Sequence, residues 1–144
     1  MAEDDSLRVL VTGATGYIGG RLAPRLVAAG HQVRVLARDP AKLRSVPWSE
    51  DVQITRGDLM DPATLDDACQ GIDVVYYLVH SMNSGRDFER HEAQAATRLV
   101  EATAAAGGRQ IIYLGGLIPD DEELSAHLES RREVERALAA HGTP

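Results

Sequence analysis

Five short apolar runs alternate along the chain with longer stretches in which apolar residues recur at three- and four-residue spacing. Short runs without strict apolar–polar alternation are typical of strands that are buried on both faces of a parallel sheet. The expected strands are Leu7–Thr12, Val33–Ala37, Val52–Thr55, Val74–Val79 and Gln110–Leu114.

The stretch between the first two runs predicts a helix. Ile18, Leu22 and Leu26 recur every fourth residue until Gly30, where glycine suits a helix C-terminus. Pro24 lies well inside this helix, so we expect a kink there rather than a helix end.

Further helical patterns follow each later strand. One covers residues 86–106, with an S-x-x-D start at Ser84 and a stop at Gly107. Another covers about Asp121–His141, and its acidic first turn suits the positive end of the helix dipole. Shorter helices are expected over Pro62–Cys69 and Ala41–Arg44.

Strands that alternate with helices imply right-handed crossovers, and therefore an α/β fold with a doubly wound parallel sheet of the Rossmann type. The 144 residues fit one domain, 1–144, that is large enough for a core. Thr143-Pro144 resembles the lead into a further strand. We therefore expect the sixth strand and the substrate region to be missing from this chain, or to follow it in a longer protein.

Charge and composition narrow the function classes. The net charge of -7 repels nucleic acid and anionic lipid, so neither is an expected partner. No apolar run approaches the roughly 20 residues that span a bilayer. The single cysteine, Cys69, cannot form an internal disulfide and is expected to pack in the core. A cytoplasmic protein fits these features best, and we predict no metal site.

The stretch VTGATGYIGG carries the candidate chemistry. Gly13, Gly16 and Gly19 follow a predicted strand and open a predicted helix, an arrangement that directs backbone N–H groups at an anion. We expect Gly13 to permit the turn, Gly16 to let a pyrophosphate approach, and Gly19 to let the helix pack on the strand. A P-loop is excluded because no Gly-Lys-Ser/Thr follows. The alternative is a structural turn that binds no ligand.

Residues 11–19 resemble the T-G-x-x-G-x-x-G fingerprint of extended and atypical short-chain dehydrogenase/reductases, which include NmrA-like and nucleoside-diphosphate-sugar epimerase-like proteins. Gly57-Asp58-Leu59 resembles that family's D-L pair, whose acid contacts the adenine amino group, and a turn-forming acid after glycine is the alternative for Asp58. Residues 73–81 resemble its fourth strand, whose end lines the cofactor ribose. The resemblance covers nearly the whole chain and implies dinucleotide binding by Gly13, Thr15, Gly16, Tyr17, Ile18, Gly19, Asp58, Leu59, Leu78, Val79 and His80.

The choice of cofactor depends on charge after the second strand. A carboxylate there meets the 2'-hydroxyl of NAD, whereas arginine meets the 2'-phosphate of NADP. The chain offers both, as Arg38 and Asp39. Arg38 directly follows the apolar run and Lys42 adds a second positive charge, so we predict NADP, with NAD as the alternative. Arg38 and Lys42 as solvated surface residues remain the competing interpretation.

The residues expected for catalysis are absent. The resembling reductases use a tyrosine, a lysine four residues later and a serine after the fifth strand. Here the tyrosine and lysine positions fall on His127 and Arg131, and Gly115-Gly116 stands where the serine would be. His127 titrates near neutral pH and shares a helical face with Arg131, so a residual proton-transfer role is one interpretation. Ordinary polar positions on a helix are the other.

The sequence therefore predicts an NADP(H)-binding domain whose parent is an oxidoreductase or epimerase acting on an unidentified small molecule. A non-catalytic NmrA-like sensor that signals through a protein partner is the alternative. A scaffold that binds no nucleotide is a third interpretation. Helices such as 86–106 form dimer faces in the resembling family, which makes a homodimer one alternative for the assembly.

Overall fold

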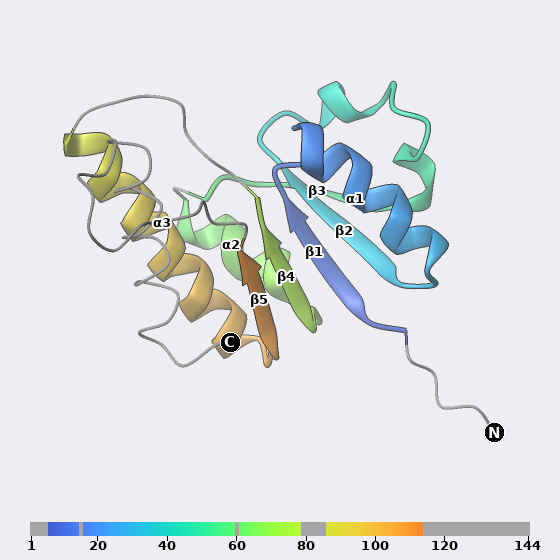
Figure 1. The fold of residues 1–144 in the computed structure, drawn as a ribbon. Helices are drawn as coiled ribbons and strands as arrows, with labels where there is room; N and C mark the ends of the chain where they lie inside the picture. Colours follow the sequence, from blue (N-terminus) through green and yellow to red (C-terminus); the bar gives the residue numbers. More distant parts are fainter. Residues whose placement is uncertain (1–5, 15, 60, 79–85, 114–144) are drawn as a thin grey trace, which may run out of the picture.

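The computed structural model describes residues 6–14, 16–59, 61–78 and 86–113 (Figure 1). Five strands form one sheet in the order β3-β2-β1-β4-β5, and every neighbouring pair is parallel. They are β1 (Arg8–Thr12), β2 (Gln32–Ala37), β3 (Gln53–Arg56), β4 (Val74–Tyr77) and β5 (Gln110–Tyr113). The predicted doubly wound α/β fold is confirmed, and each predicted strand is present within two residues of its expected bounds. The predicted strand ends at Val79 and Leu114 lie outside the described residues.

The helices are α1 (Tyr17–Ala28), α2 (Pro62–Cys69) and α3 (Arg86–Ala105), with 3-10 turns η1 (Pro40–Leu43) and η2 (Ser49–Asp51). α1 continues through Pro24 and stops before Gly30, whose φ of +93° is the left-handed value expected after a helix. The predicted helix over Ala41–Arg44 is instead the single 3-10 turn η1. The predicted helix over Asp121–His141 and the start signal at Ser84 lie outside the described residues.

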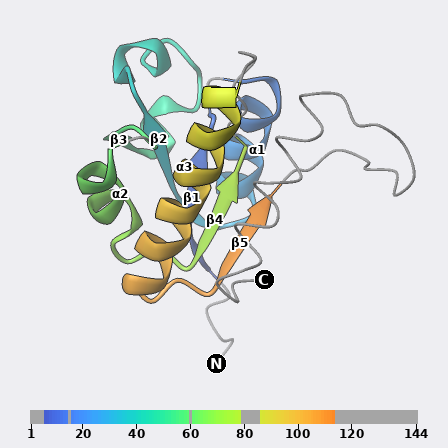
Figure 2. The same ribbon diagram turned by 90° about the vertical axis from the view of Figure 1, so that its left-hand side faces the viewer.

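The helices lie on the two faces of the sheet, α1 on one side and the neighbouring α2 and α3 on the other (Figures 1 and 2). Successive strand residues point to opposite faces, so β1 supplies both layers. Val9 and Val11 pack with the α1 side, whereas Leu10 packs with Leu65 and Leu99 of α2 and α3. Burial on both faces explains why the strands are continuous apolar runs.

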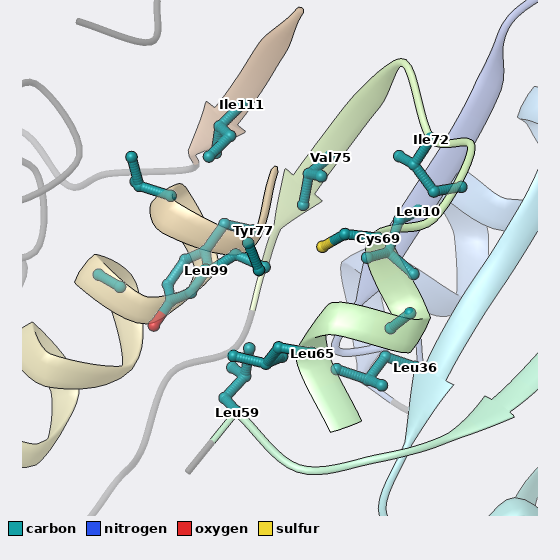
Figure 3. Close-up of a cluster of buried hydrophobic side chains, with 14 of the residues drawn as sticks. Leu10, Leu36, Leu59, Leu65, Cys69, Ile72, Val75, Tyr77, Leu99 and Ile111 are labelled. Carbon is teal, nitrogen blue, oxygen red and sulfur yellow. The ribbon is translucent and has the colours of Figure 1, made fainter. Parts of the chain in front are cut away.

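Cys69, at the end of α2, points into the cluster under α2 and α3 (Figure 3). Its side chain is fully buried, and its Sγ lies 3.8 Å from Thr103 Oγ1. Burial raises the pKa of the Cys69 thiol, because the thiolate loses hydration there. The predicted packing role is confirmed.

A hollow of about 350 Å³ opens at the amino ends of β1, β2 and β3, with Arg8, Arg34 and Asp51 among its lining residues. The Arg34 guanidinium donates to the carbonyl oxygens of Ala68 (2.7 Å) and Gln70 (2.8 Å) at the end of α2. It therefore ties α2 to the sheet. This edge lies opposite the glycine turn, which follows the carboxyl end of β1, so the hollow is not part of the site described next.

No helix within the described ranges combines the length and the apolar character that a bilayer span requires.

Candidate functional site

The glycine turn joins the carboxyl end of β1 to the start of α1. Gly13 has a φ of +76°, a backbone conformation that residues with a side chain rarely adopt. Its carbonyl accepts the Gly16 N–H at 3.0 Å. Gly16 is the N-cap of α1, and among the described residues no side chain caps this end. The first backbone N–H groups of α1 thus remain available to an anion, at the positive end of the helix dipole.

The three glycines have different steric surroundings. A Cβ on Gly19 would collide with the Gly13 carbonyl oxygen and lie 2.8 Å from the Gly13 carbonyl carbon and 2.9 Å from Ala14 Cα. All three atoms are backbone, so α1 packs directly on the turn only because residue 19 lacks a side chain. Among the described residues, a Cβ on Gly16 would meet only the Gly13 oxygen, at 3.3 Å, and Gly16 is exposed. Gly16 is therefore packed against the turn on one side and exposed on the other.

Two apolar residues stand exposed at the start of α1. Tyr17 is 74% exposed and Ile18 is 47% exposed. Arg21, one turn later, lies over the Tyr17 ring with its guanidinium carbon 3.5 Å from the ring centroid, and it donates to the Tyr17 carbonyl at 3.1 Å. This stacking holds a positive charge near the anion-binding end of the helix. Arg21 was not predicted, although its four-residue spacing from Tyr17 was visible in the sequence.

The strand order reverses between β1 and β4, because β2 and β3 continue to one side of β1 and β5 continues to the other. Ligands of doubly wound sheets bind in the crevice at the carboxyl ends of the strands at this switch point. Thr12, fully buried at the end of β1, donates to the Tyr76 carbonyl (3.0 Å) and accepts the Leu78 N–H (3.2 Å). It therefore fixes the half-buried Leu78 beside the start of the glycine turn.

Arg38 and Asp39, the two charged residues on which the choice between NAD and NADP depends, follow the end of β2. Asp39 is the N-cap of η1, and its Oδ1 accepts the Ala41 N–H at 3.1 Å. Arg38 and Lys42 are exposed. One carboxylate oxygen of Asp39 is thus engaged in local structure, and Arg38 is the residue directly after β2.

The end of β3 lies beside the end of β2. The Gly57 N–H donates to the Ala37 carbonyl at 3.0 Å, one residue before Arg38. Arg38 follows Ala37, and the partly buried Asp58 follows Gly57. Each therefore lies one residue beyond the hydrogen bond that joins Ala37 to Gly57. Leu59 packs its side chain in the core and has only its backbone left for a ligand.

The remaining predicted site residues lie outside the described residues. They are Thr15, Val79 and His80 of the cofactor set, and His127 and Arg131 of the catalytic set. Their roles stay predictions.

The arrangement defines a class of protein. A doubly wound sheet with a glycine turn at its switch point and unshielded N–H groups at the following helix is a Rossmann-type dinucleotide-binding domain. A protein-family model described as NAD(P)H-binding matches residues 13–143. The chain belongs to this NAD(P)H-binding family, and the predicted membership of the extended and atypical short-chain dehydrogenase/reductases is confirmed.

Curated relatives and a solved structure agree with this family. The chain is 34% identical over 137 residues to (4-alkanoyl-5-oxo-2,5-dihydrofuran-3-yl)methyl phosphate reductase of Streptomyces griseus, covering 94% of this chain and 44% of the relative. It is 33% identical over 145 residues to ceramide reductase of Caulobacter vibrioides, covering 97% and 44%. The structure of NADPH-dependent quinone oxidoreductase from Escherichia coli, complexed with NADPH, matches with a TM-score of 0.74 and 26% identity, over 94% of this chain and 46% of that one. This chain therefore spans about half the length of these relatives.

Proposed function

We propose that this chain is the NADP(H)-binding half of an atypical short-chain reductase. The observation that carries the choice of NADP over NAD is the exposed position of Arg38 directly after β2, beside an Asp39 whose Oδ1 caps η1. A guanidinium binds a 2'-phosphate through parallel charge-assisted hydrogen bonds. Lys42 adds positive charge on the neighbouring turn.

The proposed site residues divide along the dinucleotide. The N–H groups of Tyr17, Ile18 and Gly19 bind the pyrophosphate, with Gly13, Thr15 and Gly16 shaping the turn. Leu78, with Val79 and His80, lines the ribose on the nicotinamide side. Asp58 accepts the adenine amino group, with the Leu59 backbone beside it. When bound, NADPH supplies a hydride to an electrophilic substrate.

The reductase assignment is supported by the names of the Streptomyces griseus and Caulobacter vibrioides relatives. Because these relatives are about twice as long as this chain, the substrate site of the proposed reductase lies in sequence beyond the cofactor half. His127 is the proposed proton donor and Arg131 the proposed cation beside the ribose, at the positions of the family's tyrosine and lysine. In this proposal the protein is cytoplasmic and forms a homodimer through α3.

Isothermal titration of NADPH and NADH against Arg38→Ala tests the cofactor assignment. We expect NADPH affinity to fall about tenfold or more, because a charge-assisted hydrogen bond is worth about 1.5–3 kcal/mol, while NADH affinity stays unchanged. Arg25→Ala is the matched control, since Arg25 is an exposed arginine in the last turn of α1, away from the glycine turn. Equal wild-type affinity for NADPH and NADH would remove Arg38 from the site.

Catalysis is tested separately by following NADPH oxidation against a panel of carbonyl compounds. The proposed reductase turns over at least one compound, and His127→Ala reduces that turnover without weakening NADPH binding. Tight NADPH binding with no turnover of any compound by the full-length protein would favour the non-catalytic sensor instead.

A further inference from the structure

A threonine hydroxyl fixes the loop that carries Asp58. Thr64, in the first turn of α2, accepts the Asp58 N–H on its Oγ1 at 3.0 Å. The same Oγ1 lies 3.0 Å from the Asp58 carbonyl and 2.8 Å from the Asp61 carbonyl, within donating distance of both. One side chain thus contacts the backbone of Asp58 on both its N–H and its carbonyl group.

The packing beside Gly57 brings this hydroxyl close. A Cβ on Gly57 would lie 2.6 Å from Leu36 Cδ1, 3.1 Å from Thr64 Cβ and 3.2 Å from Thr64 Oγ1. A side chain at residue 57 would therefore crowd both Leu36 and Thr64. The glycine that precedes Asp58 allows the threonine to reach it.

Helix capping does not account for the Thr64 contact with Asp58. Asp61 is the N-cap of α2, and its Oδ1 accepts the Ala63 N–H at 3.2 Å. The hydroxyl of Thr64 reaches past this cap, six residues back along the chain, to Asp58. Two of its three contacts are therefore with Asp58 in the loop after β3, and the third is with the N-cap Asp61.

We propose that Thr64 is a positioning residue for the adenine end of the dinucleotide site. Its hydroxyl holds the backbone of Asp58, and thereby the direction of the Asp58 carboxylate toward the adenine amino group. The inference rests on the proposed function, since it concerns the same cofactor. It adds a residue that never touches the ligand and acts only through Asp58.

The test compares the affinity for NADPH with the affinity for its hypoxanthine analogue, in which a carbonyl replaces the adenine amino group. The wild-type protein should prefer NADPH by about tenfold or more, the worth of a hydrogen bond to a charged acceptor. Thr64→Val should lose most of this preference, and Thr64→Ser, which keeps the hydroxyl, should retain it. Thr97→Val is the matched control, because Thr97 Oγ1 bonds only the Ala93 carbonyl within α3 in the described structure.

A double-mutant cycle separates positioning from general destabilisation. Asp58→Ala should abolish the preference, and Thr64→Val added to it should cause no further loss, because the two residues act as one unit. Additive losses, or a Thr64→Val protein with the wild-type preference, would overturn the proposal. So would a Thr64→Ser protein that loses the preference as the valine variant does.

A measurement on the wild-type protein covers the case in which Thr64→Val does not fold. The Asp58 amide should exchange its hydrogen slowly, because Thr64 Oγ1 accepts it. Fast exchange of that amide would contradict the proposal. Failure of NADPH to bind, or a preference for NADH, would instead refute the proposed function, so the two failures are distinguishable.

Discussion

Gly19 shows how the site depends on a missing side chain. It lies where α1 crosses the turn after β1, against backbone atoms of Gly13 and Ala14 that cannot rotate away. The neighbouring Gly20 is different, since a Cβ there would meet, within the described part of the chain, only the Ala14 carbonyl oxygen, at an ordinary 3.4 Å. Two adjacent glycines in one helix thus have opposite steric requirements.

Gly19→Ala should destabilise the protein by about 1–3 kcal/mol, the cost of overpacking, because α1 must shift away from the turn. Gly20→Ala should be neutral or stabilise by up to about 1 kcal/mol, since alanine favours a helix over glycine. Denaturant unfolding of both variants measures the difference. Equal stabilities would mean that α1 does not pack on the turn as closely as described.

At the scale of elements, β1 and β4 are joined beyond their last backbone pairing by a side chain. Their ladder ends at Val11 and Tyr76, and Thr12 Oγ1 then bonds the Tyr76 carbonyl and the Leu78 N–H. The buried Thr12 hydroxyl therefore continues the contact between the two strands past the end of their backbone ladder.

Thr12→Val should lower the free energy of unfolding by about 1–3 kcal/mol, because it leaves the Leu78 N–H without its acceptor in a partly buried place. Thr12→Ser keeps the hydroxyl and should cost less, limited to the loss of one buried methyl group. Chemical denaturation distinguishes the two. A valine variant as stable as wild type would show that water satisfies Leu78.

The elements were largely predictable from the sequence, whereas several contacts were not. The five apolar runs and the bounds of α2 follow from local periodicity and from residues that begin or end an element, signals that act over a few residues. Thr12 and Thr64 carried no local signal, because their hydroxyls bond residues that folding brings near. The bond from the Ala41 N–H to Asp39 Oδ1 in η1 was likewise not predicted, although both residues are close in the sequence.

For the whole molecule, ligand binding and stability are linked. NADPH at a hundred times its dissociation constant should raise the free energy of unfolding by about 2.7 kcal/mol. Gly16→Val should abolish this gain, because its side chain would project from the exposed N-cap into the pyrophosphate position. The extended backbone of Gly16, with φ -81° and ψ 174°, is one that valine adopts, and its Cβ would lie 3.3 Å from the Gly13 carbonyl oxygen.

Thermal unfolding with and without NADPH checks this expectation, and Gly20→Ala serves as the control that should keep the ligand-induced shift. A Gly16→Val protein that keeps the full shift would exclude the proposed pyrophosphate position. A variant that is much less stable without NADPH would show that Gly16 serves the fold.

α2 is held at both ends, near its start by Thr64, which bonds Asp58 in the loop after β3, and at its end by Arg34 of β2. A helix of eight residues has almost no stability of its own in water. The stability of α2 therefore depends on the sheet and the loop to which its ends are bonded. Its amide hydrogens should exchange at the slow rate of the sheet core, through openings that release both together.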